Sequence, residues 1–285
     1  CFVQNAELED TTDGKGLPFR DLDNPNQTIW LKDKRYMIDF PAVFFHDELP
    51  RAPVAVQGAK ATLLLENRID DLYLPKGCAH IWAGNRTTDR AGANRVPTII
   101  YNRSYMYGLR YCAKSLVEYE MDKHPDEIDL LTVRYLRMKG DEALQFDPNF
   151  KINSTPRAWS VIMRKLKNNP DVPFATVAGR IGKGMASELM AFRDLAPTLP
   201  SVEEVLMNPK GAKLPSENTS AQFLITDMLA DQATFNTFDA LVEYAKRMPP
   251  EMQAKFVKDS MKRHPEVAGT PAFVQWGVKF AEVLR

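Results

Sequence analysis

Short apolar runs in the first part of the chain give way to helical patterns in the second. Four segments have the length and apolar character of strands: 1–8, 42–46, 79–83 and 105–109. Between the second and third of these, Val54–Glu66 carries apolar residues every three or four positions and follows Pro53, a pattern that predicts a helix. Buried strands that alternate with a helix are typical of a parallel sheet. The sequence therefore predicts an α/β region to about residue 112, with a hairpin at 67–74.

Beyond residue 112 the pattern is helical. Thr155-Pro156 has the form of a helix N-cap followed by proline at the first helical position, and Ser201 with Glu204 forms a capping box. Helices are predicted at 115–123, 126–138, 159–166, 220–231, 237–247, 251–262 and 271–284. Strands first and helices later indicate an α/β core (1–112), a helical lid (113–195) and a helical C-terminal extension (196–285).

The amino-acid composition bears on the partner classes and the compartment to be expected for this protein. The 285 residues include 37 Lys and Arg against 37 Asp and Glu, so the net charge is zero, which argues against nucleic acid or an anionic membrane as the partner. No apolar run reaches the roughly 18 residues of a membrane span. Three cysteines without metal-ligand spacing fit a reducing compartment, and we expect a cytoplasmic protein.

Polar residues follow two of the predicted strands. The run 42–46 ends in Asp47 and Glu48, and the run 79–83 is followed by Asn85. Because parallel strands end at the same edge of a sheet, where ligands of open α/β sheets bind, we expect these three side chains near one another. Asp47 is suited to hold Mg²⁺ through water, Glu48 to polarise an attacking water, and Asn85 to hydrogen-bond that water or a γ-phosphate oxygen.

Two arginines add positive charge to this set. Arg103 precedes the predicted strand 105–109, and Arg157 lies at the start of a predicted lid helix. Phosphoryl transfer requires positioned positive charge around a transition state whose negative charge is dispersed. The order of carboxylate pair, Asn, Arg and lid Arg therefore favours nucleotide hydrolysis.

In these motifs the chain resembles the MoxR branch of the AAA+ ATPases, from about residue 4 to about residue 195. The segments that carry the resemblance are 16–18, 44–53, 56–57, 74–75, 83–90, 96–97, 102–103 and 155–159. The resemblance implies a partial P-loop AAA+ core with a parallel sheet, followed by the helical lid and extension.

The resemblance also implies a role for each candidate residue. Asp47 and Glu48 match Walker B, Asn85 matches sensor 1, Arg103 matches the arginine finger that reaches a neighbouring subunit, and Arg157 matches sensor 2. The hairpin at 67–74 matches one that often faces the central pore. Arg95 competes with Arg103 as the finger, and Arg103 is preferred because the Asn102-Arg103 pair abuts the following strand, as it does in the family.

The implied activity is hydrolysis of Mg²⁺-ATP in a homo-oligomeric ring, a hexamer, that remodels or matures a client protein. Relatives of this branch commonly work with a partner that carries a von Willebrand A domain. Two alternatives remain open: a non-hydrolysing AAA+-like assembly or adaptor module, and an AAA+ protein that acts on nucleic acid, which salt-dependent DNA binding would reveal.

The sequence departs from the family pattern in two places. His46 replaces the usual apolar residue before the Walker B aspartate. No G-x-x-x-x-G-K-[ST] motif, whose backbone amides cradle phosphates, occurs in the 285 residues. Because that motif precedes the matched segments in the family, we expect an upstream segment that carries it.

Overall fold

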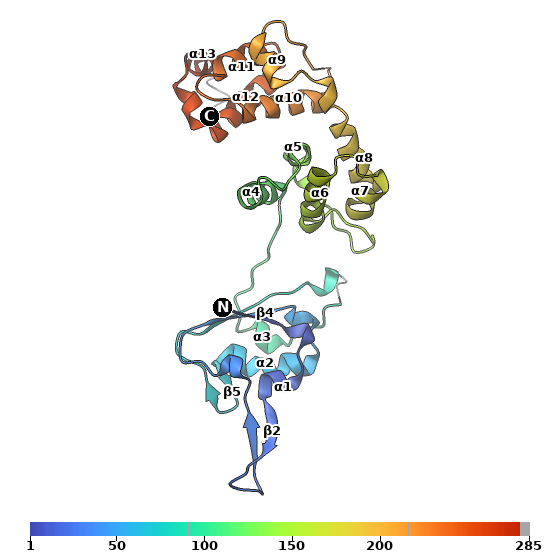
Figure 1. The fold of residues 1–285 in the computed structure, drawn as a ribbon. Coiled ribbons are helices and arrows are strands. Elements are labelled where there is room, and N and C mark those ends of the chain that lie inside the picture. Colours follow the sequence, from blue (N-terminus) through green and yellow to red (C-terminus); the bar gives the residue numbers. More distant parts are fainter. Residues whose placement is uncertain (90–91, 216, 280–285) are drawn as a thin grey trace. The chain divides into compact units, whose positions relative to one another are not determined.

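The computed structural model describes residues 1–89, 92–215 and 217–279, which form two compact units, Cys1–Leu109 and Arg110–Arg285 (Figure 1). Arg90, which belongs to a family-like segment, and the last residues of the predicted helix 271–284 lie outside the described residues. Each unit has hydrophobic clusters of its own.

Unit 1, Cys1–Leu109, contains the strands and a few helices. In chain order these are β1 (Phe2–Asn5), α1 (Thr11–Lys15), β2 (Leu17–Arg20), β3 (Thr28–Leu31), β4 (Val43–Asp47), α2 (Val54–Glu66), β5 (Arg68–Ile69), β6 (Leu72–Tyr73), β7 (Ala79–Trp82) and α3 (Thr98–Tyr101). Four 3-10 turns join them: η1 (Ala6–Leu8), η2 (Lys34–Tyr36), η3 (Leu49–Arg51) and η4 (Thr87–Asp89).

The centre of unit 1 is a three-stranded parallel sheet in the order β1-β4-β7. Phe44 of β4 lies opposite Phe2 of β1 and His80 of β7, so β4 is the central strand. The predicted strands at 1–8, 42–46 and 79–83 are therefore confirmed, with the first ending earlier, at Asn5. An α/β unit with a parallel sheet is the coarse fold that the sequence predicted.

The two faces of this sheet differ in burial. Phe44 and Leu63 of α2 pack together on one face, where the core of the unit lies. On the other face Val3, Val43 and Ile81 are exposed. Successive side chains of a strand point to opposite faces of the sheet, so His46 lies on the same covered face as Phe44. His46 is completely buried there.

Two hairpins leave the body of unit 1. The β5–β6 hairpin confirms the predicted turn at 67–74; Asn67 begins it in a left-handed conformation, and its carbonyl accepts a hydrogen bond from Leu74 N at 2.8 Å. The β2–β3 hairpin, which extends away from the rest of unit 1 (Figure 1), was not predicted. All eight of its strand residues are exposed.

The predicted strand at 105–109 is wrong. The described backbone forms no strand there, and Tyr105 and Leu109 are more than nine-tenths exposed. A strand requires a neighbour for its backbone hydrogen bonds, and the described residues provide none for this segment.

Unit 2, Arg110–Arg285, is helical in its described part. Its helices are α4 (Ala113–Lys123), α5 (Leu130–Lys139), α6 (Pro156–Asn168), α7 (Phe174–Ile181), α8 (Lys183–Arg193), α9 (Val202–Met207), α10 (Thr219–Asp231), α11 (Phe238–Ala245), α12 (Pro250–Arg263) and α13 (Pro271–Lys279). Short 3-10 turns are η5 (Gly140–Ala143), η6 (Ala196–Thr198) and η7 (Pro265–Gly269).

Two hydrophobic cores lie in unit 2. The first surrounds Trp159 of α6 and includes residues of α4 to α8. The second surrounds Phe238 and Phe256, whose rings stack 5.6 Å apart. Helix α10 contributes to both, because Leu224 packs in the first core and Leu229 in the second. Helix α10 therefore joins two helical bundles, one around each of these hydrophobic cores.

Local capping set several helix starts as predicted. Thr155 Oγ1 accepts a hydrogen bond from Ala158 N, and Pro156 opens α6. Ser201 and Glu204 form the predicted capping box of α9. The helix predicted at 126–138 begins later, at Leu130, because Asp129 is its N-cap and accepts from Thr132 N at 2.8 Å.

Candidate functional site

The carboxylate pair lies at the carboxyl end of the central strand. Asp47 is the last residue of β4, and its Oδ1 accepts a hydrogen bond from Glu48 N at 3.0 Å. Glu48 adopts a left-handed conformation with φ 54°, which is rare for a residue with a side chain and costs about 1–2 kcal/mol. Strain of this kind persists only where the surroundings enforce it, and it is common at functional turns.

One oxygen of Glu48 is a buried acceptor without a hydrogen bond. Its Oε2 has no partner among the described residues, although almost all buried polar atoms in proteins have one. A buried, unpaired carboxylate oxygen has the property needed of a group that accepts a hydrogen bond from an incoming ligand or water.

Asn85 lies at the same sheet edge and is exposed. The backbone before it is held against the carboxylate turn, because Ala83 N donates to His46 O at 3.0 Å and Leu49 N donates to Ala83 O at 3.1 Å. Gly84 permits the close approach, since a Cβ there would lie 2.2 Å from Cδ of Pro50. The structure therefore brings Asp47, Glu48 and Asn85 to one edge, as the sequence predicted.

The two candidate finger arginines follow different segments of unit 1, and both are exposed. Arg103 follows α3 and, contrary to prediction, precedes no strand, so the reason for preferring it is weakened. Arg95 follows Asn94, whose backbone N donates to Pro50 O at 2.6 Å and whose Nδ2 donates to Ala52 O at 3.1 Å. The segment before Arg95 is thus tied to the turn that follows Glu48.

Arg157 belongs to unit 2. It is the second residue of α6, exposed, and lies between the capping Thr155 and the buried Trp159. The structure brings the three polar residues of unit 1 together and holds Arg157 in a separate unit.

A series of hydrogen-bonded polar side chains, some buried and some half-buried, adjoins the carboxylate turn. Lys60 of α2 is completely buried; its Nζ lies 2.5 Å from Glu9 Oε2, 3.0 Å from Gln4 Oε1 and 3.2 Å from His46 Nδ1. His46 Nε2 lies 3.1 Å from His80 Nδ1, and His80 Nε2 lies 2.8 Å from Asn67 Oδ1.

The sequence motifs described above did not predict this series of side chains. The signal that could have found it is Lys60 itself, which interrupts the apolar face formed by Val56 and Leu63. A lysine is almost never fully buried without partners.

Both histidines are held neutral. Burial, with the positive charge of Lys60 and then the neighbouring ring of His80, lowers the pKa of His46 to about 3. Burial and Lys60 lower the pKa of His80 to about 4. Burial also lowers the pKa of Lys60, against the opposing effect of Glu9. The two imidazoles therefore act as neutral hydrogen-bonding groups at neutral pH.

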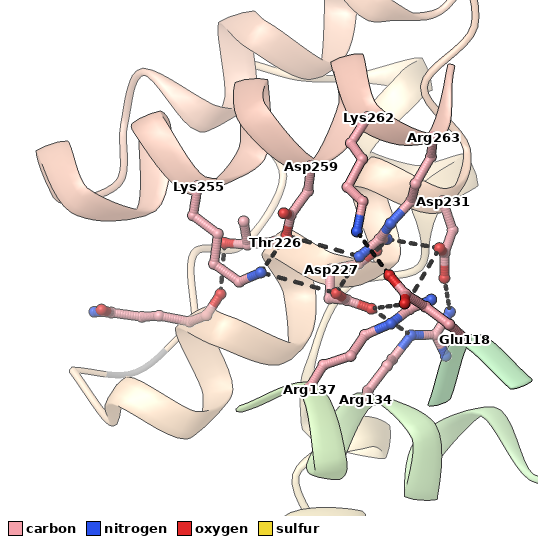
Figure 2. Close-up of polar contacts among 11 residues, drawn as sticks. Glu118, Arg134, Arg137, Thr226, Asp227, Asp231, Lys255, Asp259, Lys262 and Arg263 are labelled. Carbon is pink, nitrogen blue, oxygen red and sulfur yellow. Dashed lines mark hydrogen bonds and ion pairs between the residues drawn. The ribbon is translucent and has the colours of Figure 1, made fainter. Parts of the chain in front are cut away.

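A second polar cluster, in unit 2, joins its two bundles (Figure 2). Asp227 of α10 is completely buried, and its carboxylate lies 2.9 Å from Nη1 of Arg137 on α5 and 2.5 Å from Nη2 of Arg263 on α12. Burial opposes ionisation of Asp227, but Arg263 and Arg137 outweigh it and lower its pKa. The buried carboxylate of Asp227 is paired with arginines from two other helices, which fits a structural role.

The described residues contain no group of three or more His, Cys, Asp or Glu side chains arranged to hold a metal ion. A Mg²⁺ ion at Asp47 would take the remaining ligands from water and phosphate, which is how magnesium commonly binds with nucleotides.

Comparison with family models, curated proteins and solved structures found no match. Within residues 1–89, 92–215 and 217–279, every helix is too short or too polar to cross a membrane.

Proposed function

We propose that the chain is part of a MoxR-like AAA+ ATPase subunit that couples hydrolysis of Mg²⁺-ATP to remodelling of a client protein. The observation that carries the proposal is the carboxylate turn at the end of the central parallel strand, with Asn85 beside it and an unpaired oxygen on Glu48. Ligands of open parallel sheets bind at this edge.

Each residue of the turn has a separate task in this proposal. Asp47 would hold Mg²⁺ through water, and Glu48 would polarise the attacking water through Oε2. Asn85 would orient that water or a γ-phosphate oxygen. Arg157 would act on the nucleotide of its own subunit, and Arg103 or Arg95 on that of the neighbour in a homo-oligomeric, hexameric ring.

A second candidate is a non-hydrolysing AAA+-like assembly module. The two candidates differ in one measurable property: the protein produced from its complete reading frame binds and hydrolyses ATP only under the first proposal. A von Willebrand A domain partner remains an expectation of the resemblance.

The direct test replaces Glu48 in the protein produced from its complete reading frame. Glu48→Gln removes the charge that polarises water and keeps the size of the side chain. We expect ATP binding to persist and turnover to fall by about 10²-fold or more, the scale of positioned general bases. Asp47→Asn should instead weaken Mg²⁺-dependent nucleotide binding.

The matched control is Glu66→Gln, which alters a half-exposed glutamate of unit 1 at the end of α2, where it pairs with Arg68. Turnover in this variant should stay near that of the unmodified protein. Normal turnover in both Glu48→Gln and Asp47→Asn would refute the assignment of the carboxylate turn.

A further inference from the structure

The hydrogen-bonded side chains that run from Lys60 through His46 and His80 to Asn67 have a single consistent arrangement of protons. Lys60 has three donors and no acceptor, and its three partners are Glu9, Gln4 and Nδ1 of His46. Nδ1 of His46 must therefore accept, so the proton of this neutral ring is on Nε2.

Asn67, at the other end of this series of side chains, sets the same direction. Asn67 Oδ1 can only accept, so Nε2 of His80 carries its proton and Nδ1 of His80 is free to accept from His46. The direction set by Lys60 and the direction set by Asn67 agree. Every hydrogen bond from Lys60 to Asn67 then has one donor and one acceptor.

The charged and titratable groups around His46 prevent a different arrangement. They are Lys60 from α2, His80 from β7, and Glu9 with Arg35 beyond Lys60; Gln4 of β1 and Tyr36 complete the enclosure. A proton on Nδ1 of His46 would face the ammonium of Lys60, 3.2 Å away. Two donors would then face each other without an acceptor, so the proton of the neutral ring stays on Nε2.

Two members of this series, Asn67 and His46, adjoin the β5–β6 hairpin and the carboxylate turn respectively. Asn67 is the C-cap of α2 and the residue from which the β5–β6 hairpin leaves. His46 directly precedes Asp47, and its carbonyl accepts from Ala83 N two residues before Asn85. The hairpin is accessible to a partner, since Tyr73 is 70% exposed.

We propose that Asn67, His80, His46 and Lys60 form a hydrogen-bond relay that couples the position of the β5–β6 hairpin to the Asp47–Glu48 turn. Displacement of the hairpin would withdraw the acceptor of His80, and the change would reach the turn through His46. The link to hydrolysis rests on the function proposed above, in which Glu48 polarises water; these four are positioning residues.

The first test measures the proton positions directly in the unmodified full chain. In ¹⁵N-histidine NMR spectra recorded at about pH 7, His46 and His80 should both show protonated Nε2 and unprotonated Nδ1. A proton on Nδ1 of His46 would overturn the relay.

The second test removes the hydrogen bond between Asn67 and His80. Asn67→Gly suits the left-handed backbone and removes the acceptor oxygen. We expect the ring resonances of both His80 and His46, and the backbone amides of Asp47 and Glu48, to shift. Asn67→Asp keeps an acceptor oxygen, so in this variant the amide resonances of Asp47 and Glu48 should stay at their positions in the unmodified protein.

The matched control is Asp70→Gly, in the same hairpin and with the same left-handed backbone, φ 53°, but with its side chain outside the relay. It should leave His46 and Glu48 unchanged. If Asn67→Gly shifts His80 alone, or if Asp70→Gly shifts Glu48 equally, the relay does not couple the hairpin to the turn.

Turnover separates this inference from the proposed function. In the protein produced from its complete reading frame, Asn67→Gly should lower turnover by up to about 10²-fold with ATP binding retained, as for a misplaced catalytic group. Absence of hydrolysis in the unmodified protein would refute the ATPase proposal, whereas the amide shifts on the unliganded chain decide the relay by themselves.

Discussion

At the scale of single residues, Gly84 determines how closely the Asn85 loop can approach the carboxylate turn. A Cβ at this position would lie 2.2 Å from Cδ of Pro50, and a proline ring cannot rotate away. We therefore expect Gly84→Ala to lower the free energy of unfolding of unit 1 by about 1–3 kcal/mol, the usual cost of overpacking. Urea unfolding of the variant, with the fluorescence of Trp82 as the local probe, measures this.

Gly58→Ala is the matched control. Gly58 lies inside α2, and a Cβ there would have no atom within 4 Å. Because alanine has less backbone freedom to lose in a helix, this change should stabilise by about 0.5–1 kcal/mol. Equal effects of the two substitutions would mean that the contact with Pro50 does not limit the loop.

At the scale of elements, Asp227 of α10 connects α5 with α12 by ion pairs (Figure 2). Removing one partner of a buried ion pair leaves uncompensated charge, so Asp227→Ala should destabilise unit 2 by about 3–5 kcal/mol. Glu243→Gln breaks a half-exposed pair with Lys246 and should cost no more than about 1 kcal/mol. Urea unfolding followed by helical circular dichroism compares the two, and similar losses would contradict a structural role for Asp227.

At the scale of the whole molecule, a ring would place an arginine of one subunit at the site of its neighbour. An Arg103→Ala subunit mixed with a Glu48→Gln subunit should then regain hydrolysis, because some neighbours combine an intact finger with an intact Glu48. Fingers acting in trans contribute about 10³–10⁵ in rate, so the recovery is measurable. The Arg157→Ala and Glu48→Gln pair should not recover, since each subunit's own site is damaged.

Arg95→Ala in the same mixing experiment decides between the two finger candidates. Recovery with Arg95→Ala and none with Arg103→Ala would assign the finger to the segment that Asn94 ties to the carboxylate turn. No recovery with either variant, together with a monomeric protein in the presence of ATP, would end the shared-site model.

The parts of the fold that the sequence predicted depend on interactions between residues close in the chain. Thr155 caps α6 through a residue three positions later, and Ser201 with Glu204 does the same for α9. The end of β4 at Asp47 and Glu48 was predictable because an apolar run changes abruptly to two carboxylates. Each of these features depends on residues within a few positions of one another, so it can be predicted without knowledge of the tertiary structure.

The tertiary structure alone decided which predicted strand pairs and which buried groups find partners. The segment 105–109 has the composition of a strand, but a strand exists only where a neighbour supplies hydrogen bonds. Lys60, His46 and His80 lie on α2, β4 and β7. Only the tertiary structure brings Lys60 Nζ to 3.2 Å from His46 Nδ1, and His46 Nε2 to 3.1 Å from His80 Nδ1. Whether a buried polar side chain has hydrogen-bond partners depends on which groups lie near it in the folded protein, and the order of residues in the sequence does not show this.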